Sequence, residues 1–100
     1  MENRVLANLE PQSVFTFFEQ LCQLPHESHK TTAASDWAEK FAKDRNLACR
    51  RDKAGNVVIW KDATPGYEDH PTVMIQGHLD MVCVKDIGVE HDFDKDPLKL

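Results

Sequence analysis

Apolar residues recur at intervals of three and four in two stretches near the start of the chain, the pattern of an amphipathic helix. The first stretch runs from about Pro11, which a first helical turn tolerates, to Leu24, and Pro25 would end it. The second runs from Thr31 to Asn46. Its apolar face consists of Ala34, Trp37, Ala38, Phe41 and Ala42. We therefore predict two helices.

Two short runs of strand character follow the second helix. They are Leu47–Asp52 and Val57–Lys61. The residues between them, Lys53–Asn56, suit a tight turn because Gly55 and Asn56 can adopt positive φ. The sequence therefore predicts a β-hairpin.

A third strand is predicted after a polar loop. The loop, Asp62–Pro71, contains Pro and Gly and mixed charges, and Thr72–Gln76 is a mostly apolar run of strand length. Such a run suits a strand that is buried on both faces of a sheet. Val84–Leu100 has no regular period and is predicted to be irregular. The order of elements favours an α/β fold in which two helices precede a hairpin and a buried strand of a mixed sheet.

Composition narrows the class of protein. The chain has 100 residues, about one small domain, with 41% hydrophobic and 29% charged residues, as in ordinary globular proteins. Its net charge of −5 argues against binding to nucleic acid, which needs a basic stripe. Residues 1–10 do not resemble a signal peptide, and no apolar run is long enough to span a membrane. We expect neither a nucleic-acid nor a membrane partner.

The cysteines also bear on location. Cys22, Cys49 and Cys83 are odd in number, far apart and without a CxxC pair, which fits reduced thiols better than disulfides or a structural zinc site. We expect them to serve in packing and the chain to be cytoplasmic.

The candidate chemistry lies at the end of the third predicted strand. His78 could offer a neutral ring nitrogen to a metal ion, and Asp80, two residues on, could hydrogen-bond the other nitrogen and fix the tautomer. The C-terminal ends of strands are where open α/β sheets place ligands. The competing interpretation is a surface histidine next to an unrelated acid, because a His-x-Asp tripeptide alone is weak evidence.

Other chemistry-bearing residues have plainer interpretations. Asp92, Asp94 and Asp96 alternate as in a calcium loop, but Pro97 stands where such a loop requires glycine, so a solvated acidic loop is expected. His26 and His29 flank a turn and are expected at the surface. Cys83 lies near Asp80, but thiolates favour closed structural zinc sites, so it is expected to pack as a small apolar residue.

The order and spacing of several short motifs resemble the N-terminal region of the aminoacyl-histidine (Xaa-His) dipeptidase family, whose members belong to the superfamily of two-zinc peptidases and deacylases. The resemblance covers nearly all of this chain but only a small N-terminal fraction of a family protein. The specific part is Gln76–Val82, which contains His78-Leu79-Asp80-Met81-Val82. The supporting motifs are Pro25-His26 with Ser28, Arg51-Asp52, Gly55-Asn56-Val57, His91-Asp92-Phe93 and Asp96-Pro97.

The resemblance implies a hydrolase that cleaves Xaa-His dipeptides with two zinc ions in each active site. Carried over by position, His78 would be the first zinc ligand and Asp80 the catalytic aspartate. The remaining ligands and the general base of the family lie downstream of the matched region. The chain would then be the N-terminal part of the catalytic domain, inactive by itself, and the full-length enzyme would be a homodimer.

Two alternatives remain open at this point. The superfamily shares the His78 motif, so the enzyme could act on other dipeptides or on N-acyl amino acids. The 100-residue chain could also be a non-catalytic, stand-alone α/β module.

Overall fold

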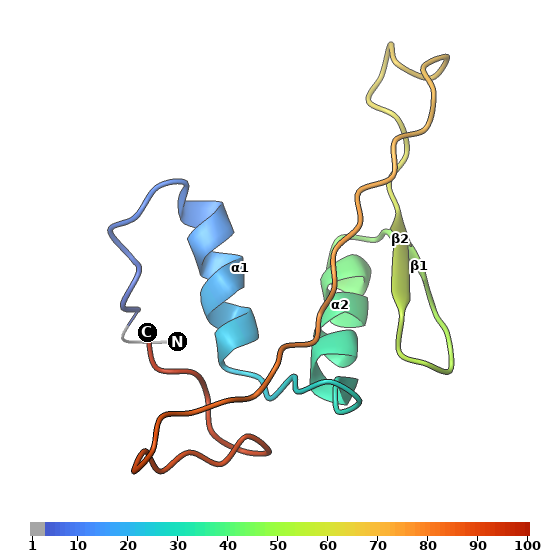
Figure 1. Ribbon diagram of the computed structural model, residues 1–100. Helices are drawn as coiled ribbons and strands as arrows, with labels where there is room; N and C mark the ends of the chain where they lie inside the picture. The colour runs from blue at the N-terminus through green and yellow to red at the C-terminus, as the bar shows by residue number, and fades with distance from the viewer. Residues whose placement is uncertain (1–3) are drawn as a thin grey trace. The chain divides into compact units, whose positions relative to one another are not determined.

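The computed structural model describes residues 4–100 and contains two helices followed by a two-stranded antiparallel sheet (Figure 1). The elements are α1 (Gln12–Cys22), α2 (Thr32–Asp44), β1 (Ala48–Arg51) and β2 (Val57–Trp60). Both predicted helices and the predicted hairpin are confirmed, and the fold class is a mixed α/β one. Residues 1–3, which the prediction of no signal peptide included, lie outside the described part.

The described residues form two compact units, one comprising residues 4–34 together with Asp80–Leu100 and the other comprising Ser35–Leu79. The first unit is organised around α1. The carboxylate of Glu19, a buried residue of this helix, forms an ion pair with Arg4 at 3.2 Å. At the helix end the Cys22 carbonyl, which has no partner within the helix, accepts the backbone N–H of Leu98 at 2.8 Å. The helix therefore holds residues from both ends of the chain.

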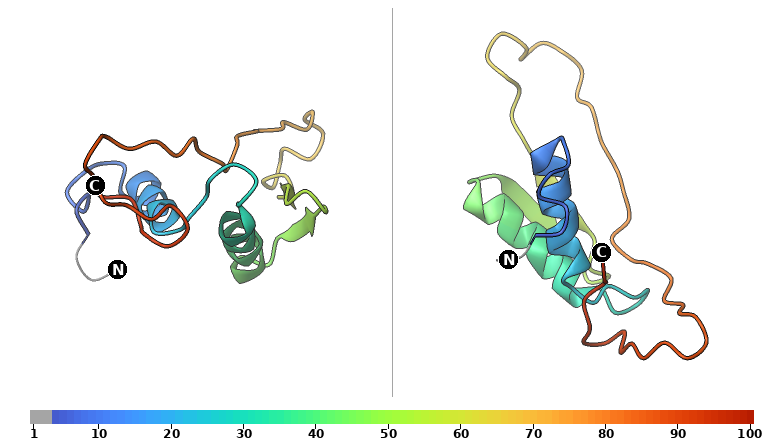
Figure 2. Two further views of the ribbon diagram at one scale, coloured as in Figure 1. Left: turned by 60° about the horizontal axis from the view of Figure 1, so that its bottom comes forward. Right: turned by 90° about the vertical axis from the view of Figure 1, so that its left-hand side faces the viewer.

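The second unit contains the hairpin and most of α2, which lie side by side in Figures 1 and 2, and the irregular segment that follows β2. The strand register pairs Ala48 with Trp60 and Arg51 with Val57. Arg51 donates to the carboxylates of Asp36 and Glu39 on α2, the second at 2.9 Å. Ser35, which is fully buried, donates its hydroxyl to the Gly55 carbonyl at 2.6 Å. These polar contacts dock the hairpin on the helix.

The hairpin turn is closed by a side chain. Asp52 accepts hydrogen bonds from the Asn56 backbone N–H at 2.9 Å and the Asn56 amide at 2.8 Å. These bonds lower the pKa of Asp52, chiefly through the amide. Gly55 has the predicted positive φ of 91°. Asn56 does not use this conformation, since among described non-glycine residues only His29 and Asn46 have positive φ. Asn56 is instead held by Asp52 just before β2 starts.

The predicted buried strand Thr72–Gln76 is the main correction. The structure shows no strand there, and Val73, Met74 and Ile75 are 81%, 83% and 94% exposed (Figure 1). A strand requires ladder hydrogen bonds from a neighbour, and among residues 4–100 the only sheet is the β1–β2 pair. The segment has the composition of a buried strand and no partner within the described residues.

The remaining regions have the irregular structure predicted from the sequence. Asp62–Pro71 is a loop, and Val84–Leu100 contains turns but neither helix nor strand. Neither described helix has the length and apolar character needed to cross a membrane.

Candidate functional site

His78 and Asp80 differ in their surroundings. The His78 side chain is exposed, whereas Asp80 is half-buried. The division between the two compact units falls between Leu79 and Asp80. The pairing of the imidazole with the carboxylate therefore stays a prediction from their spacing.

Asp80 accepts a hydrogen bond from a residue far away in the sequence. The hydroxyl of Ser28, in the segment that connects α1 to α2, donates to Asp80 Oδ2 at 2.6 Å. This distance is typical of a hydroxyl bound to a charged carboxylate, which makes a stronger bond than a neutral acceptor would.

The backbone brings Ser28 and Asp80 together. Glu27 and Met81 form an isolated parallel β-bridge. In it the N–H of Met81 donates to the His26 carbonyl at 2.9 Å, and the N–H of Ser28 donates to the Met81 carbonyl at 3.3 Å. Because Met81 directly follows Asp80, these two bonds set the position of the Asp80 backbone relative to Ser28.

The two histidines beside this bridge have local structural roles. His26 is half-buried, with its Nδ1 atom 2.6 Å from the Leu24 carbonyl. His29 is exposed, as predicted, and occupies a turn with a φ of 66°. The turn is closed by the N–H of Lys30, which donates to the Glu27 carbonyl at 2.8 Å.

Cys83 has the properties of a packing residue. Its side chain is half-buried, and its thiol contacts the Met81 carbonyl at 3.9 Å. Desolvation raises the pKa of the Cys83 thiol, with a further rise from the negative charge of Glu27. The half-buried position of Cys83 fits the expectation from sequence that it packs as a small side chain.

The Asp92–Asp96 segment is a turn in which carboxylates bind the backbone of the same segment. Asp92 accepts the backbone N–H of Asp94 at 2.9 Å, and Asp96 accepts the backbone N–H of Asp92 at 2.8 Å. Two of the three carboxylates therefore bind the loop's own backbone, as acidic residues in solvated turns commonly do.

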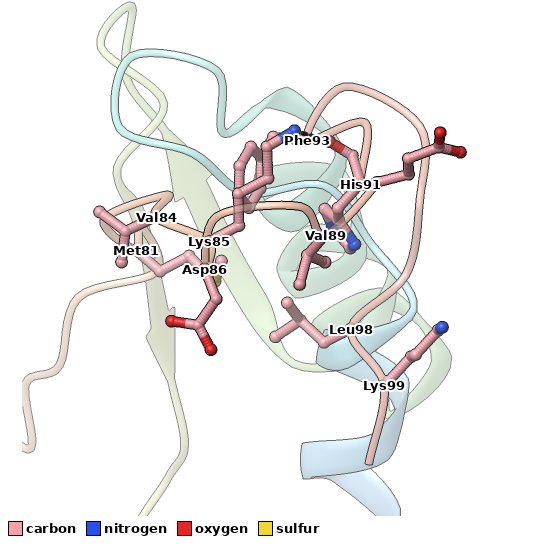
Figure 3. Close-up of a pocket in the computed structure, with 10 residues that line it drawn as sticks. Met81, Val84, Lys85, Asp86, Val89, His91, Phe93, Leu98 and Lys99 are labelled. Atoms are coloured by element: carbon pink, nitrogen blue, oxygen red, sulfur yellow. Dashed lines mark hydrogen bonds between the residues drawn. The ribbon is translucent and has the colours of Figure 1, made fainter.

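A cavity of about 460 Å³ opens within the first unit, beginning one residue after Asp80 (Figure 3). Its apolar wall includes Val89 and Leu98, whose side chains point toward one another in the figure. His91 also lines it, with its ring 4.7 Å from that of Phe93, and the Nε2 atom of His91 is buried without a hydrogen-bond partner. The sequence offered His91 only as part of a motif, so its burial is new information.

The donor set can be tested against the zinc site that the resemblance implies. Within residues 4–100, no three His, Cys, Asp or Glu side chains are grouped so that they could hold a metal ion. A zinc ion needs about four ligands, three of them from protein in an open catalytic site. An exposed imidazole fits one ligand position and a fixed carboxylate fits a supporting one, so the described residues suit part of such a site but not a complete one.

Comparison with known proteins finds that the chain is similar to dipeptidases, which confirms the resemblance predicted from its motifs. It is 37% identical over 94 residues to the cytosol non-specific dipeptidase of Escherichia coli (strain K12). A crystal structure of aminoacylhistidine dipeptidase from Vibrio alginolyticus matches it with a TM-score of 0.89 and 37% identity. No protein-family model matches the chain.

The length of the match sets what it can establish. Each alignment covers 94% of this chain but 19% of the other protein. The chain thus spans about a fifth of the length of either dipeptidase.

Proposed function

We propose that this chain is the N-terminal part of the catalytic domain of a dizinc dipeptidase that hydrolyses Xaa-His dipeptides. The protein that contains this segment is called the parent protein below. The observation that carries the proposal is the 37% identity to a dipeptidase over 94% of the chain. The motif around His78 and Asp80 supports it.

His78 is assigned as the first zinc ligand and Asp80 as the catalytic aspartate. The imidazole of His78 is exposed and could offer a ring nitrogen to a metal ion. Asp80 would orient that ring, and the Ser28 hydrogen bond restricts the Asp80 carboxylate to one direction. When bound, zinc supplies Lewis acidity toward the scissile carbonyl and lowers the pKa of water. The other ligands and the general base would come from the rest of the parent protein, so the isolated chain is expected to be inactive.

The proposal also includes a substrate specificity, namely a preference for dipeptides that end in histidine. One similar protein is named an aminoacylhistidine dipeptidase and the other a non-specific dipeptidase. A broader dipeptidase, or an enzyme acting on N-acyl amino acids, is therefore the second candidate. We further propose a cytoplasmic location, which the name of the Escherichia coli relative supports, and a homodimeric parent protein.

The test is a substrate profile of the purified parent protein. We expect it to hydrolyse β-alanyl-histidine, to lose this activity to a chelator and to regain it with zinc. Faster hydrolysis of dipeptides without histidine, or of N-acyl amino acids, would favour the second candidate. Metal-independent cleavage, or none with any of these substrates, would overturn the dizinc dipeptidase.

A further inference from the structure

We propose that Ser28 is a positioning residue for Asp80, a role that rests on the proposed function. The Ser28 hydroxyl donates to Asp80 Oδ2 at 2.6 Å. A carboxylate that supports a metal-bound imidazole must present one oxygen in a defined direction, since it sets the tautomer and the ring plane. Binding of Oδ2 by Ser28 limits rotation of the carboxylate and so fixes where Oδ1 points.

The position of Ser28 is itself fixed from two sides. Its backbone N–H is bound to the Met81 carbonyl at 3.3 Å, next to Asp80 in the chain. Ser28 also lies inside the turn that the Lys30 N–H closes by donating to the Glu27 carbonyl at 2.8 Å. Lys30 also forms an ion pair with Asp94 at 3.1 Å, which ties the same turn to the C-terminal segment of the unit.

This arrangement differs from a structural hydrogen bond that only adds stability. For a serine that only adds stability, any buried acceptor would serve. Here the acceptor is Asp80, the residue assigned as the catalytic aspartate. The hydroxyl binds one of the two carboxylate oxygens, which sets the direction of the other relative to an imidazole N–H. Loss of the hydroxyl is expected to affect the chemical step and zinc binding more than substrate binding.

Three substitutions in the parent protein separate the hydroxyl from the volume of the side chain. Ser28→Thr keeps a hydroxyl, Ser28→Val has nearly the shape of threonine without one, and Ser28→Ala removes it with less bulk. We expect the Val and Ala variants to lose about 10-fold in both zinc affinity and kcat relative to the Thr variant, with KM changed less than about twofold. Zinc affinity is measured by competition with a chelator, independently of activity.

The coupling to Asp80 is tested in the same series. Ser28→Ala should weaken zinc binding much less in an Asp80→Ala background than in the native one, because its effect passes through the carboxylate. The positioning role would be overturned if the Ser28→Thr and Ser28→Val variants had equal zinc affinity and kcat. It would also be overturned if Ser28→Ala weakened zinc binding equally with and without Asp80. If Asp80→Ala alone retained normal zinc binding and activity, the assignment of Asp80 in the proposed function would fall instead.

Discussion

The carboxylate of Asp80 is bound by a hydroxyl that lies 52 residues earlier in the chain. This bond depends on the parallel bridge between Glu27 and Met81, which brings two loops together without forming a sheet. Among the single residues of the candidate site, Asp80 is therefore a carboxylate held by a loop that is distant in the sequence but adjacent in the structure.

Replacement of Asp80 tests its role directly. In the parent protein, Asp80→Ala should keep the fold but lower zinc affinity or kcat/KM by about 10- to 100-fold, as is typical when the partner of a metal ligand is lost. Asp80→Glu should be nearly as harmful because the longer side chain misplaces the carboxylate. Steady-state kinetics and zinc analysis measure both, with the exposed loop residue Asp69 changed to Ala as the control. Normal kcat/KM and zinc content in Asp80→Ala would make Asp80 an ordinary surface acid.

The spacing of His78 and Asp80 suggested a metal ligand with a supporting carboxylate, and the resemblance of the surrounding motif to the dipeptidase family selected them. Neither was enough to find the bond from Ser28, although Ser28 belonged to a recognised motif. Contacts between residues 52 positions apart depend on tertiary structure, and no local pattern encodes them. The burial of His91 Nε2 escaped prediction for the same reason.

At the scale of elements, α1, α2 and the hairpin could be predicted because their signals are local. The period of apolar residues defines a helix, and Gly55 marks the turn between β1 and β2. The structure of Thr72–Gln76 could not be predicted in the same way. A strand forms only beside a hydrogen-bonding neighbour, and the composition of the segment does not show whether one is present. We propose that this segment pairs with strands of the parent protein outside the present sequence.

Ile75 provides a test of that pairing. Ile75 is 94% exposed in this chain, so Ile75→Asp should change the stability of the 100-residue chain by less than about 0.5 kcal/mol. In the parent protein the same change would bury an unpaired charge and should cost several kcal/mol, about 3 or more. Chemical denaturation measures both values. Ile87→Asp, at another fully exposed isoleucine, is the control. Equal, small effects of Ile75→Asp in the two proteins would contradict the buried strand.

At the scale of the whole molecule, apolar side chains remain exposed on more than one element. They include Val14 and Phe18 on one face of α1, Val58 and Trp60 on β2, and Val73, Met74 and Ile75. Neighbouring exposed apolar residues, such as Val14 and Phe18 on α1 or Val73–Ile75, are characteristic of surfaces that pack against other protein. The described structure thus has the surface expected of part of a larger domain.

The isolated 100-residue chain should therefore self-associate or be marginally stable. Its apolar surfaces would associate with those of other copies, and the unpaired segment at Val73–Ile75 would add strand edges. Sedimentation and thermal unfolding measure this, with a hydrophobic dye as a second probe. A monomer that unfolds in one sharp and reversible transition would instead favour a stand-alone module.

The proposal that His78 is a zinc ligand of a dipeptidase can be tested by zinc analysis of the parent protein with His78 replaced. His70, an exposed histidine in the preceding loop, is the matched control. We expect about two zinc ions per chain in the wild-type and His70→Ala proteins. We expect at least one fewer in His78→Ala, together with loss of dipeptide hydrolysis. A His78→Ala protein with the zinc content and activity of the wild type would contradict the proposal.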